Sequence, residues 1–366
     1  MSRVPVARRM VTADRRRLAV SLIGVGAAIG LVLLVQGLWS GQLVQLTAYE
    51  DHAGADLFVA QKGTESMLGD ASVVPLAVAI EIGEMSGVIS ADPVHIHYTV
   101  LDLHGAREFV LLVGSRPDGL GGPWELTAGR QAQSGDEVVL DRTLAEQHGL
   151  ATGDRVTMLG RDLVVVGLSQ GTRSWMTSLV FITADAAADL TGGGRVASFI
   201  LVRTDQPDAV AAVIGESSGL DALTPDLLAA NDRRVLAGVM ARPVRLMIAV
   251  TLAAAALVVS LTVYSAVVER IRDYGVFKAI GAGRSRLIGI VLGQAVTVSI
   301  GGTVLGWFVY LGGSRLIRWL RPQFWFSIEP GDLLVVSGGA LAMAAVAAVL
   351  PSHRLARLDP AAVYRG

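Results

Sequence analysis

Four long apolar blocks without a charged residue constrain this chain more than any other feature. They are Leu18–Leu38, Leu246–Val268, Leu287–Gly313 and Leu333–Pro351. A helix needs about 20 apolar residues to cross a hydrocarbon core of roughly 30 Å. Charged residues make up only 17% of the chain, against about 25% in soluble domains. We therefore expect an α-helical membrane protein with four transmembrane helices, at 18–38, 246–268, 287–313 and 333–351.

Lys and Arg residues beside these blocks indicate the orientation, because cytoplasmic flanks of membrane helices are enriched in them. Fourteen lie in 1–17, 269–286 and 352–366, whereas three lie in 314–332. We expect a cytoplasmic N-terminus (1–17), a cytoplasmic loop (269–286), a short outer loop (314–332) and a cytoplasmic tail (352–366). The long segment 39–245 then lies outside.

The segment 39–245 has the pattern of an extracytoplasmic mixed α+β domain between the first and second transmembrane helices. Short β-prone runs alternate with turn clusters such as Pro117-Asp118-Gly119. We expect helical stalks at 42–52 and 224–240, the second with Thr224 as N-cap and Pro225 at the first helical position. The expected strands are 94–100, 109–113, 137–140, 155–159, 163–167, 179–182 and 198–202, and the expected short helices are 143–148 and 184–190.

Several kinds of site are excluded or disfavoured. The only lysines, Lys62 and Lys278, do not follow a Gly-rich phosphate loop, so we expect no ATP hydrolysis in this chain. There is no cysteine and the net charge is −1, which argues against thiol chemistry and nucleic-acid binding. His95 and His97 with Asp102 and His104 allow a metal site, but a polar strand face explains them more simply. We therefore expect no catalytic residue, no metal and no cofactor in this chain.

Small residues recur at helix-packing spacing inside the apolar blocks. The pairs Gly26–Gly30, Gly289–Gly293 and Gly302–Gly306 each form a G-x-x-x-G motif, which allows two membrane helices to approach closely. Gln36 and Gln294 are the only long polar side chains in the blocks, and packing is their default role. The absence of intramembrane charge argues against an ion-coupled transporter.

The segment between the second and third blocks combines charged residues with an apolar stripe. A solvated loop would not need Val276, Phe277 and Ile280, and their spacing beside Arg272 and Lys278 is typical of a short helix that docks on a partner.

The same segment resembles a known family. Residues 269–282 (ERIRDYGVFKAIGA) are similar to the cytoplasmic loop of FtsX/MacB-type ABC transporter permeases, and residues 351–361 resemble the C-terminal signature of that family. The order of motifs in 136–167 also matches. The compact outer domain and residues 54–59 (GADLFV) look closest to the DevC-like and heme-efflux branch.

The resemblance implies a permease subunit of the bacterial plasma membrane that dimerises, here as a homodimer, and binds two copies of a separate ABC ATPase. ATP and Mg would be bound by that ATPase. The substrate would be hydrophobic or amphipathic, such as heme, a glycolipid, a lipopeptide or a drug, exported by motion of the outer domains. The residues expected to contact the ATPase are Glu269, Arg270, Arg272, Tyr274, Val276, Phe277, Lys278 and Ile280.

Two other functions remain open at this point. A mechanotransmitter would relay ATP hydrolysis to an outer partner such as a cell-wall hydrolase, without transport. A membrane scaffold or sensor would not need the docking segment at 269–286.

Overall fold

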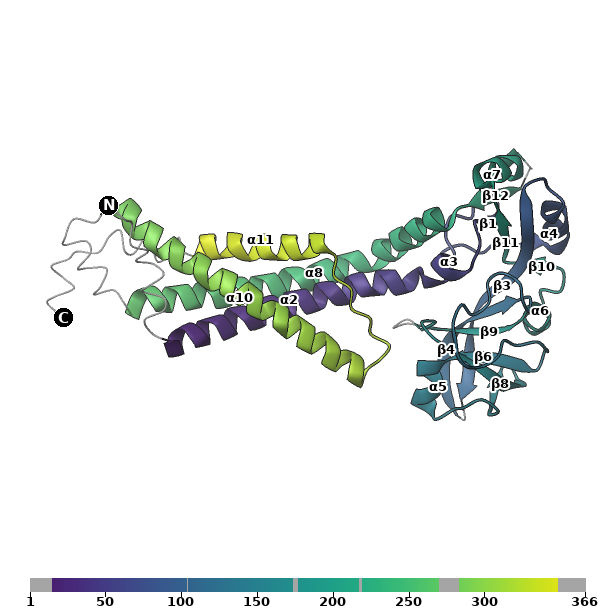
Figure 1. The fold of residues 1–366 in the computed structure, drawn as a ribbon, viewed down its shortest axis with the longest axis horizontal. Coiled ribbons are helices and arrows are strands. Elements are labelled where there is room, and N and C mark those ends of the chain that lie inside the picture. Colours follow the sequence, from purple (N-terminus) through teal and green to yellow (C-terminus); the bar gives the residue numbers. More distant parts are fainter. Residues whose placement is uncertain (1–14, 104, 174–176, 217–218, 270–282, 348–366) are drawn as a thin grey trace. The chain divides into compact units, whose positions relative to one another are not determined.

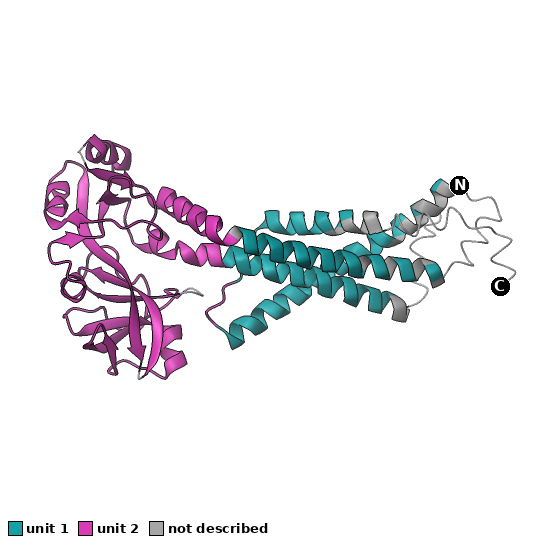
Figure 2. Ribbon diagram, turned by 180° about the vertical axis from the view of Figure 1, so that it is seen from behind, with its two compact units in different colours: residues 1–41, 242–321, 326–366 teal, residues 42–241, 322–325 magenta. Residues whose placement is uncertain are grey.

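The computed structural model describes residues 15–103, 105–173, 177–216, 219–269 and 283–347. The chain divides into two compact units (Figure 2). Residues 1–41, 242–321 and 326–366 form the first, which we call the helical unit. Residues 42–241 and 322–325 form the second, which we call the outer domain. Helices α2 and α8 each contribute residues to both units.

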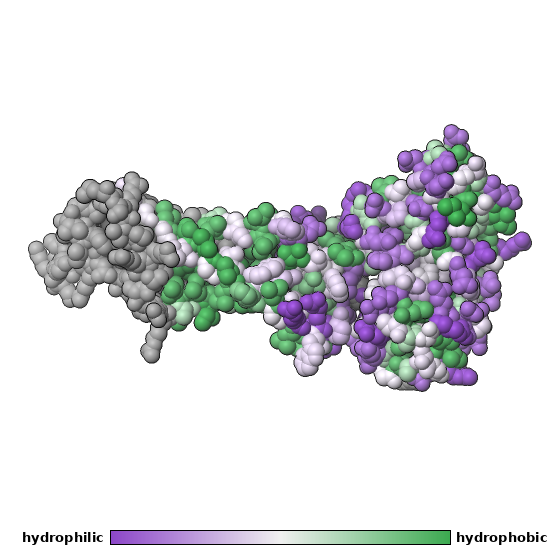
Figure 3. Space-filling model, viewed as in Figure 1, coloured by the Kyte–Doolittle hydropathy of each residue, from purple (hydrophilic) through white to green (hydrophobic). Residues whose placement is uncertain are grey.

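In the described part of the helical unit there are four long helices (Figure 1). They are α2 (Arg15–Leu46), α8 (Pro225–Glu269), α10 (Arg284–Leu320) and α11 (Pro330–Ala347). Their outward surface is largely apolar in Figure 3, with Leu246, Val250 and Leu257 of α8 each about 60% exposed or more. Such exposure suits side chains that face lipid.

Among the described residues, two helical stretches, Leu18–Leu46 and Ala295–Leu320, are long and apolar enough to cross a membrane. A third is added if Pro225–Met240 and Arg242–Val258, bent by 65°, count as one span. Pro243 lies next to this bend, and a proline inside a helix removes a hydrogen bond and kinks the backbone. Helix α11 occupies most of the expected fourth span, and residues 348–351 lie outside the described part of the chain. Four spans therefore stay a prediction.

Helix α10 differs from the expected boundary, because it continues past Gly313 to Leu320. The expected outer loop at 314–332 thus begins with helix and ends with the first turn of α11. Hydropathy detects the end of the apolar run, whereas the helix continues until its backbone hydrogen bonding is interrupted. Arg321 precedes Pro322 and has φ −142° and ψ 82°, the extended region that a following proline favours.

The outer domain is a mixed α+β fold. Among its described residues, ten strands form one sheet, in the order β12-β1-β11-β3-β4-β9-β6-β8-β5 with β7 paired to β3 and β8. Pairs β4–β9 and β6–β8 are parallel and the other pairs are antiparallel. A separate ribbon joins β2 and β10. The strands are β1 (Leu57–Gln61), β2 (Val74–Pro75), β3 (Val88–Leu103), β4 (Ala106–Ser115), β5 (Leu126–Gly129), β6 (Glu137–Asp141), β7 (Arg155–Met158), β8 (Arg161–Ser169), β9 (Ser178–Thr183), β10 (Val196–Ala197), β11 (Phe199–Thr204) and β12 (Leu220–Leu223).

Strand β3 organises this sheet because it is long enough to pair with β11, β4 and β7. Its first half pairs with β11 and its second half with β4. The short helices cover buried clusters: Leu144 of α5 and Ala187 of α6 belong to one, and Ile82 of α4 and Ile214 of α7 to another. The short helices are α3 (Ala48–His52), α4 (Leu76–Gly83), α5 (Arg142–His148), α6 (Ala184–Thr191) and α7 (Pro207–Glu216).

The expected α+β pattern is confirmed element by element. All seven expected strand stretches fall on strands, and the two expected short helices are α5 and α6. The stalk cap is confirmed as well, since Leu227 N–H donates to Thr224 Oγ1 at 3.3 Å. Sequence analysis missed five strands and two helices, which are β1, β2, β5, β10, β12, α4 and α7. The short edge strands carry little alternation, so only their pairing identifies them.

Asp141 joins β6 to α5 and is 1% exposed. Its Oδ1 accepts hydrogen bonds from Thr143 N–H at 2.8 Å and Leu144 N–H at 3.2 Å, which caps α5. Its Oδ2 accepts from Thr172 Oγ1 at 2.8 Å. A single carboxylate therefore satisfies a helix end and a buried hydroxyl.

The Asp141→Ala variant is expected to lower the free energy of unfolding of the outer domain by about 2–3 kcal/mol, because both the cap and the Thr172 partner are lost. Thermal unfolding of the purified chain measures this. Asp189→Ala, at an exposed position of α6, is the matched control and should change stability by less than about 0.5 kcal/mol. Equal stability of the two variants would contradict the assigned role.

Candidate functional site

The segment expected to contact an ATPase lies between two helices of the helical unit. Glu269 is the last residue of α8, and Gly283 is the N-cap of α10. The other expected contact residues, Arg270, Arg272, Tyr274, Val276, Phe277, Lys278 and Ile280, lie outside the described residues. Their role therefore stays a prediction.

Two of the three G-x-x-x-G motifs meet at one crossing of α2 and α10. A β-carbon added at Gly306 would lie 2.9 Å from Ile29 Cγ2, 3.0 Å from the Gly26 carbonyl oxygen and 3.0 Å from the Gly30 amide nitrogen. A β-carbon at Gly30 would lie 2.6 Å from Val309 Cγ1, and one at Gly302 would collide with Val25. The glycines of each helix thus receive the backbone of the other, as close membrane-helix packing requires.

Gly289 of the third motif is not part of this crossing. A β-carbon at Gly289 would meet no atom within 4 Å among the described residues. The Gly293 carbonyl accepts a hydrogen bond from Thr297 Oγ1 at 2.7 Å, within α10 itself. The three motifs have the same spacing in the sequence. Which of them faces another helix depends on the tertiary structure, so the sequence could not distinguish them.

A polar contact links α11 to α2 in the same unit. Asp332, in the first turn of α11, accepts hydrogen bonds from Gln36 Nε2 at 3.1 Å and Ser40 Oγ at 3.1 Å. Gln36 therefore has the packing role expected for it. Sequence analysis did not single out Asp332, although its position directly before the fourth apolar block was the available signal.

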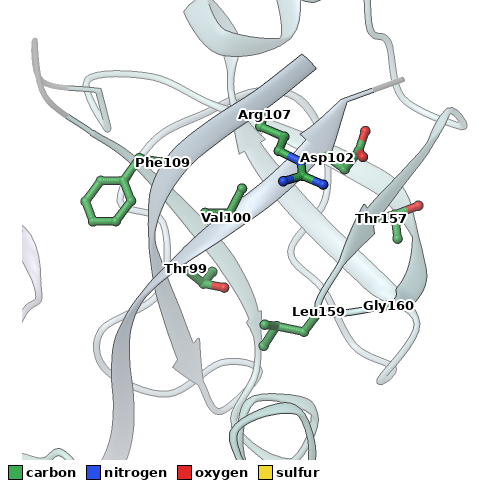
Figure 4. Close-up of a pocket in the computed structure, with 8 residues that line it drawn as sticks. All are labelled: Thr99, Val100, Asp102, Arg107, Phe109, Thr157, Leu159 and Gly160. Atoms are coloured by element: carbon green, nitrogen blue, oxygen red, sulfur yellow. The ribbon is translucent and has the colours of Figure 1, made fainter. Parts of the chain in front are cut away.

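The outer domain carries an exposed groove of about 620 Å³ on the sheet face formed by β3, β4 and β7 (Figure 4). Its apolar part includes Val100, Phe109 and Leu159, which are 46%, 51% and 54% exposed. Tyr98 stacks on Phe109 with ring centroids 5.3 Å apart. The groove is lined by Thr99, Val100, Asp102, Arg107, Phe109, Thr157, Leu159 and Gly160.

Strand register explains why these side chains gather. Val100 lies opposite Phe109, and Asp102 lies opposite Arg107, on the same face of the β3–β4 pair. Leu159 and Gly160 form the turn between β7 and β8, with φ of 50° and 79°. Leucine rarely adopts a positive φ, so this turn holds an apolar side chain at the groove in an unfavourable backbone conformation.

The two described histidines of β3 differ in burial, since His95 is buried and His97 is exposed. Among the described residues no group of three or more His, Cys, Asp or Glu could hold a metal ion. His95 is 3% exposed, and burial lowers the pKa of His95, with the neighbouring His97 lowering it further. His104 lies outside the described residues.

Comparison with known families decides which kind of protein this is. Residues 19–218 match the MacB-like periplasmic core domain, and residues 245–360 match the FtsX-like permease C-terminal domain. The chain belongs to the FtsX/MacB-type family of ABC transporter permeases. The first match covers most of α2 and most of the outer domain, and the second begins within α8 and covers α10 and α11.

Full-length relatives of this permease carry the same description. The uncharacterized ABC transporter permeases Rv0072 and Rv2563 of Mycobacterium tuberculosis are each 27% identical to it, over 96% of both chains. The macrolide export ATP-binding/permease protein MacB of Agrobacterium fabrum is 35% identical over 26% of this chain and 14% of its own length. The names of both full-length relatives describe permease components.

Two solved structures resemble part of the permease. The periplasmic region of MacB from Actinobacillus actinomycetemcomitans is 15% identical, with a TM-score of 0.39 over 47% of this chain and 90% of that one. The extracellular domain of the transporter YknZ from Gram-positive bacteria is 13% identical, with a TM-score of 0.36 over 46% of this chain and 99% of that one.

Proposed function

We propose that this permease is the membrane subunit of an ABC exporter for a hydrophobic or amphipathic compound, driven by a separate ATPase. The observation that carries the proposal is the order of parts along the chain. An outer domain precedes an FtsX-like C-terminal part, while no lysine follows a phosphate-binding loop. The energy source must therefore be supplied by a partner through the segment 269–286.

The outer domain offers chemistry that suits such a substrate. The groove combines exposed apolar and aromatic side chains with Arg107 and Asp102. Ligand sites commonly combine an apolar lining with a few polar groups, and their volumes of about 300–1,000 Å³ include this one. We take this as support for an amphipathic compound rather than for an ion.

The assembly that follows from the proposal is two permease copies with two ATPase copies. A single permease with few spans encloses little volume, and the docking segment occurs once in each chain. Native mass of the detergent-purified complex tests this stoichiometry. A 1:1 complex that hydrolyses ATP at full rate would contradict it.

Reconstitution with the ATPase in proteoliposomes tests the function itself. ATP should drive accumulation of a lipophilic probe such as heme or a lipopeptide inside inverted vesicles. An ATPase variant that binds but does not hydrolyse ATP is the control. Permease-stimulated hydrolysis without movement of any lipophilic probe would favour the alternative, in which the outer domain transmits force to an outer partner.

Both termini and the segment 269–286 are proposed to lie in the cytoplasm, with the outer domain outside. The chain has no cysteine, so single cysteines report topology directly. A membrane-impermeant thiol reagent should label Gly194→Cys in intact cells and should label Gly283→Cys only after permeabilisation. Both glycines are exposed, and no atom of the described residues lies within 4 Å of a β-carbon added at either. Labelling of Gly283→Cys from outside would reverse the orientation.

A further inference from the structure

Two carboxyl groups are buried together where the chain leads into and out of the outer domain. Glu50 of α3 is 1% exposed and Asp232 of α8 is 0% exposed. Asp232 Oδ1 accepts hydrogen bonds from the N–H groups of Met67 at 2.9 Å and Leu68 at 3.4 Å. Asp232 Oδ2 and both carboxyl oxygens of Glu50 are buried and have no donor among the described residues.

No basic side chain in the described residues neutralises this pair. Arg233 donates to Thr47 Oγ1 at 2.8 Å, and Arg234 donates to Asn231 Oδ1 at 2.9 Å. The other titratable groups that act on the pair are acidic or phenolic. They are Tyr49 and Asp51 of α3 and Tyr98 of β3.

Two buried carboxylates without a counter-charge are costly, so one of them is expected to keep its proton. Burial raises the pKa of Glu50 well above its usual range, and Asp232, which lies within hydrogen-bonding reach, raises it further. Burial and the same two carboxyls also raise the pKa of Tyr98 to about 12. The proton is placed on Glu50, because neither of its carboxyl oxygens has a donor in the described part of the chain, whereas Asp232 Oδ1 already accepts two backbone N–H groups.

We propose that Glu50 is protonated at neutral pH and donates a hydrogen bond to Asp232 Oδ2, forming a proton-dependent clasp between α3 and α8. This one bond satisfies Asp232 Oδ2 and gives the Glu50 hydroxyl its acceptor. Asp232 also holds the backbone of Met67 and Leu68, and Asn231 Nδ2 donates to the Glu65 carbonyl at 2.9 Å. The clasp therefore joins the segment that leads into the outer domain, the loop after β1 and the segment that leads out.

Ionisation of Glu50 would place two like charges in contact without solvent, so the clasp opens as the proton leaves. The sign follows from proton linkage. The folded state binds one proton more than the unfolded state between the ordinary pKa of a glutamate and the raised value of Glu50, so stability falls as pH rises through this window. Below the ordinary glutamate pKa, both states are protonated and the effect vanishes.

Two conservative variants distinguish the effect of the Glu50 proton from the effect of side-chain shape at this site. Glu50→Gln keeps a donor toward Asp232 Oδ2 without a titrating proton. Asp232→Asn keeps the acceptor for Met67 and Leu68 and presents an amide donor to an ionised Glu50. Glu65→Gln, which changes an exposed carboxylate in the same neighbourhood, is the matched control.

The test uses the full-length permease in lipid nanodiscs. Between pH 6 and pH 9 the Tm of the wild type and of Glu65→Gln should fall by about 5 °C or more. The Tm of Glu50→Gln and of Asp232→Asn should not show this decrease. Spin labels at His52→Cys and Ala230→Cys should give one narrow distance distribution at pH 6 and a broader one at pH 9. In Glu50→Gln the distribution should stay narrow at both pH values.

Infrared spectroscopy of the wild type gives a result that does not depend on how the variants fold. A protonated carboxylic acid band at pH 7 that shifts on ¹³C-glutamate labelling supports the clasp. Absence of that band overturns the proposal, as does a Glu50→Gln unfolding profile that runs parallel to the wild type across the pH range. These readouts need neither substrate nor ATPase, so they succeed or fail independently of the transport function.

Discussion

Gly306→Leu is expected to abolish the close packing of α2 against α10 and to reduce the yield of folded permease severalfold. Two of the three nearest atoms to a new β-carbon are backbone atoms, the Gly26 carbonyl oxygen and the Gly30 nitrogen, each at 3.0 Å. Backbone atoms cannot move aside as a side chain does by changing its rotamer. Helices α2 and α10 must therefore move apart where they cross. Overpacking of this kind costs about 1–3 kcal/mol, and a leucine adds further bulk to a contact built for glycine.

Gly312→Leu is the matched control, because it makes the same change on the same helix. Gly312 is exposed, and an added β-carbon meets nothing within 4 Å among the described residues. Denaturation of both variants in mixed micelles, followed by circular dichroism and by size-exclusion chromatography, compares their folded fractions. Equal stability of the two variants would show that the α2–α10 crossing does not depend on glycine.

The Phe277→Ala/Ile280→Ala double variant should insert normally and lose stimulation of the partner ATPase. The two side chains are three positions apart in the sequence and would share one face of a helix. Truncation of an aromatic anchor in a docking groove costs about 2 kcal/mol or more, which corresponds to about thirtyfold weaker association. Binding of the ATPase to permease nanodiscs and permease-stimulated ATP hydrolysis measure the loss.

An exposed apolar pair in the outer domain provides the comparison for this variant. Ile80 and Ile89 are each 67% exposed, so Ile80→Ala/Ile89→Ala removes exposed apolar side chains outside the docking segment. It should leave ATPase recruitment unchanged. Full recruitment and full stimulated turnover in the Phe277→Ala/Ile280→Ala variant would exclude the coupling role of 269–286.

Local pattern determined the class of this protein and many of its elements. Uncharged blocks of about 20 residues identify membrane helices because the bilayer offers no partner for charge. Alternation in 94–100 identified part of β3, and the Thr224-Pro225 pair located the start of α8. These signals are readable because the residues that carry them act within one element.

Helix ends and short edge strands were harder to read. Helix α10 ends at Leu320, seven residues past the last residue of the apolar block, because Pro322 rather than hydropathy interrupts the helix. Strand β1 became recognisable only through pairing with β11 and β12, which lie more than 100 residues later in the chain.

The glycine pairs of α2 and α10 and the Glu50–Asp232 pair show what the sequence determined and what the tertiary structure determined. Sequence by itself determined that Gly26, Gly30, Gly302 and Gly306 could receive a helix, since i, i+4 spacing puts small residues on one face. Only the tertiary structure decided that these two pairs face each other and that Gly289 faces no other helix among the described residues. Nothing in the sequence predicts that Glu50 contacts Asp232, because an acidic residue in an amphipathic segment is expected to face solvent. Burial that the fold imposes on both residues brings them together, and this burial, followed by the contact with Asp232, raises the pKa of Glu50.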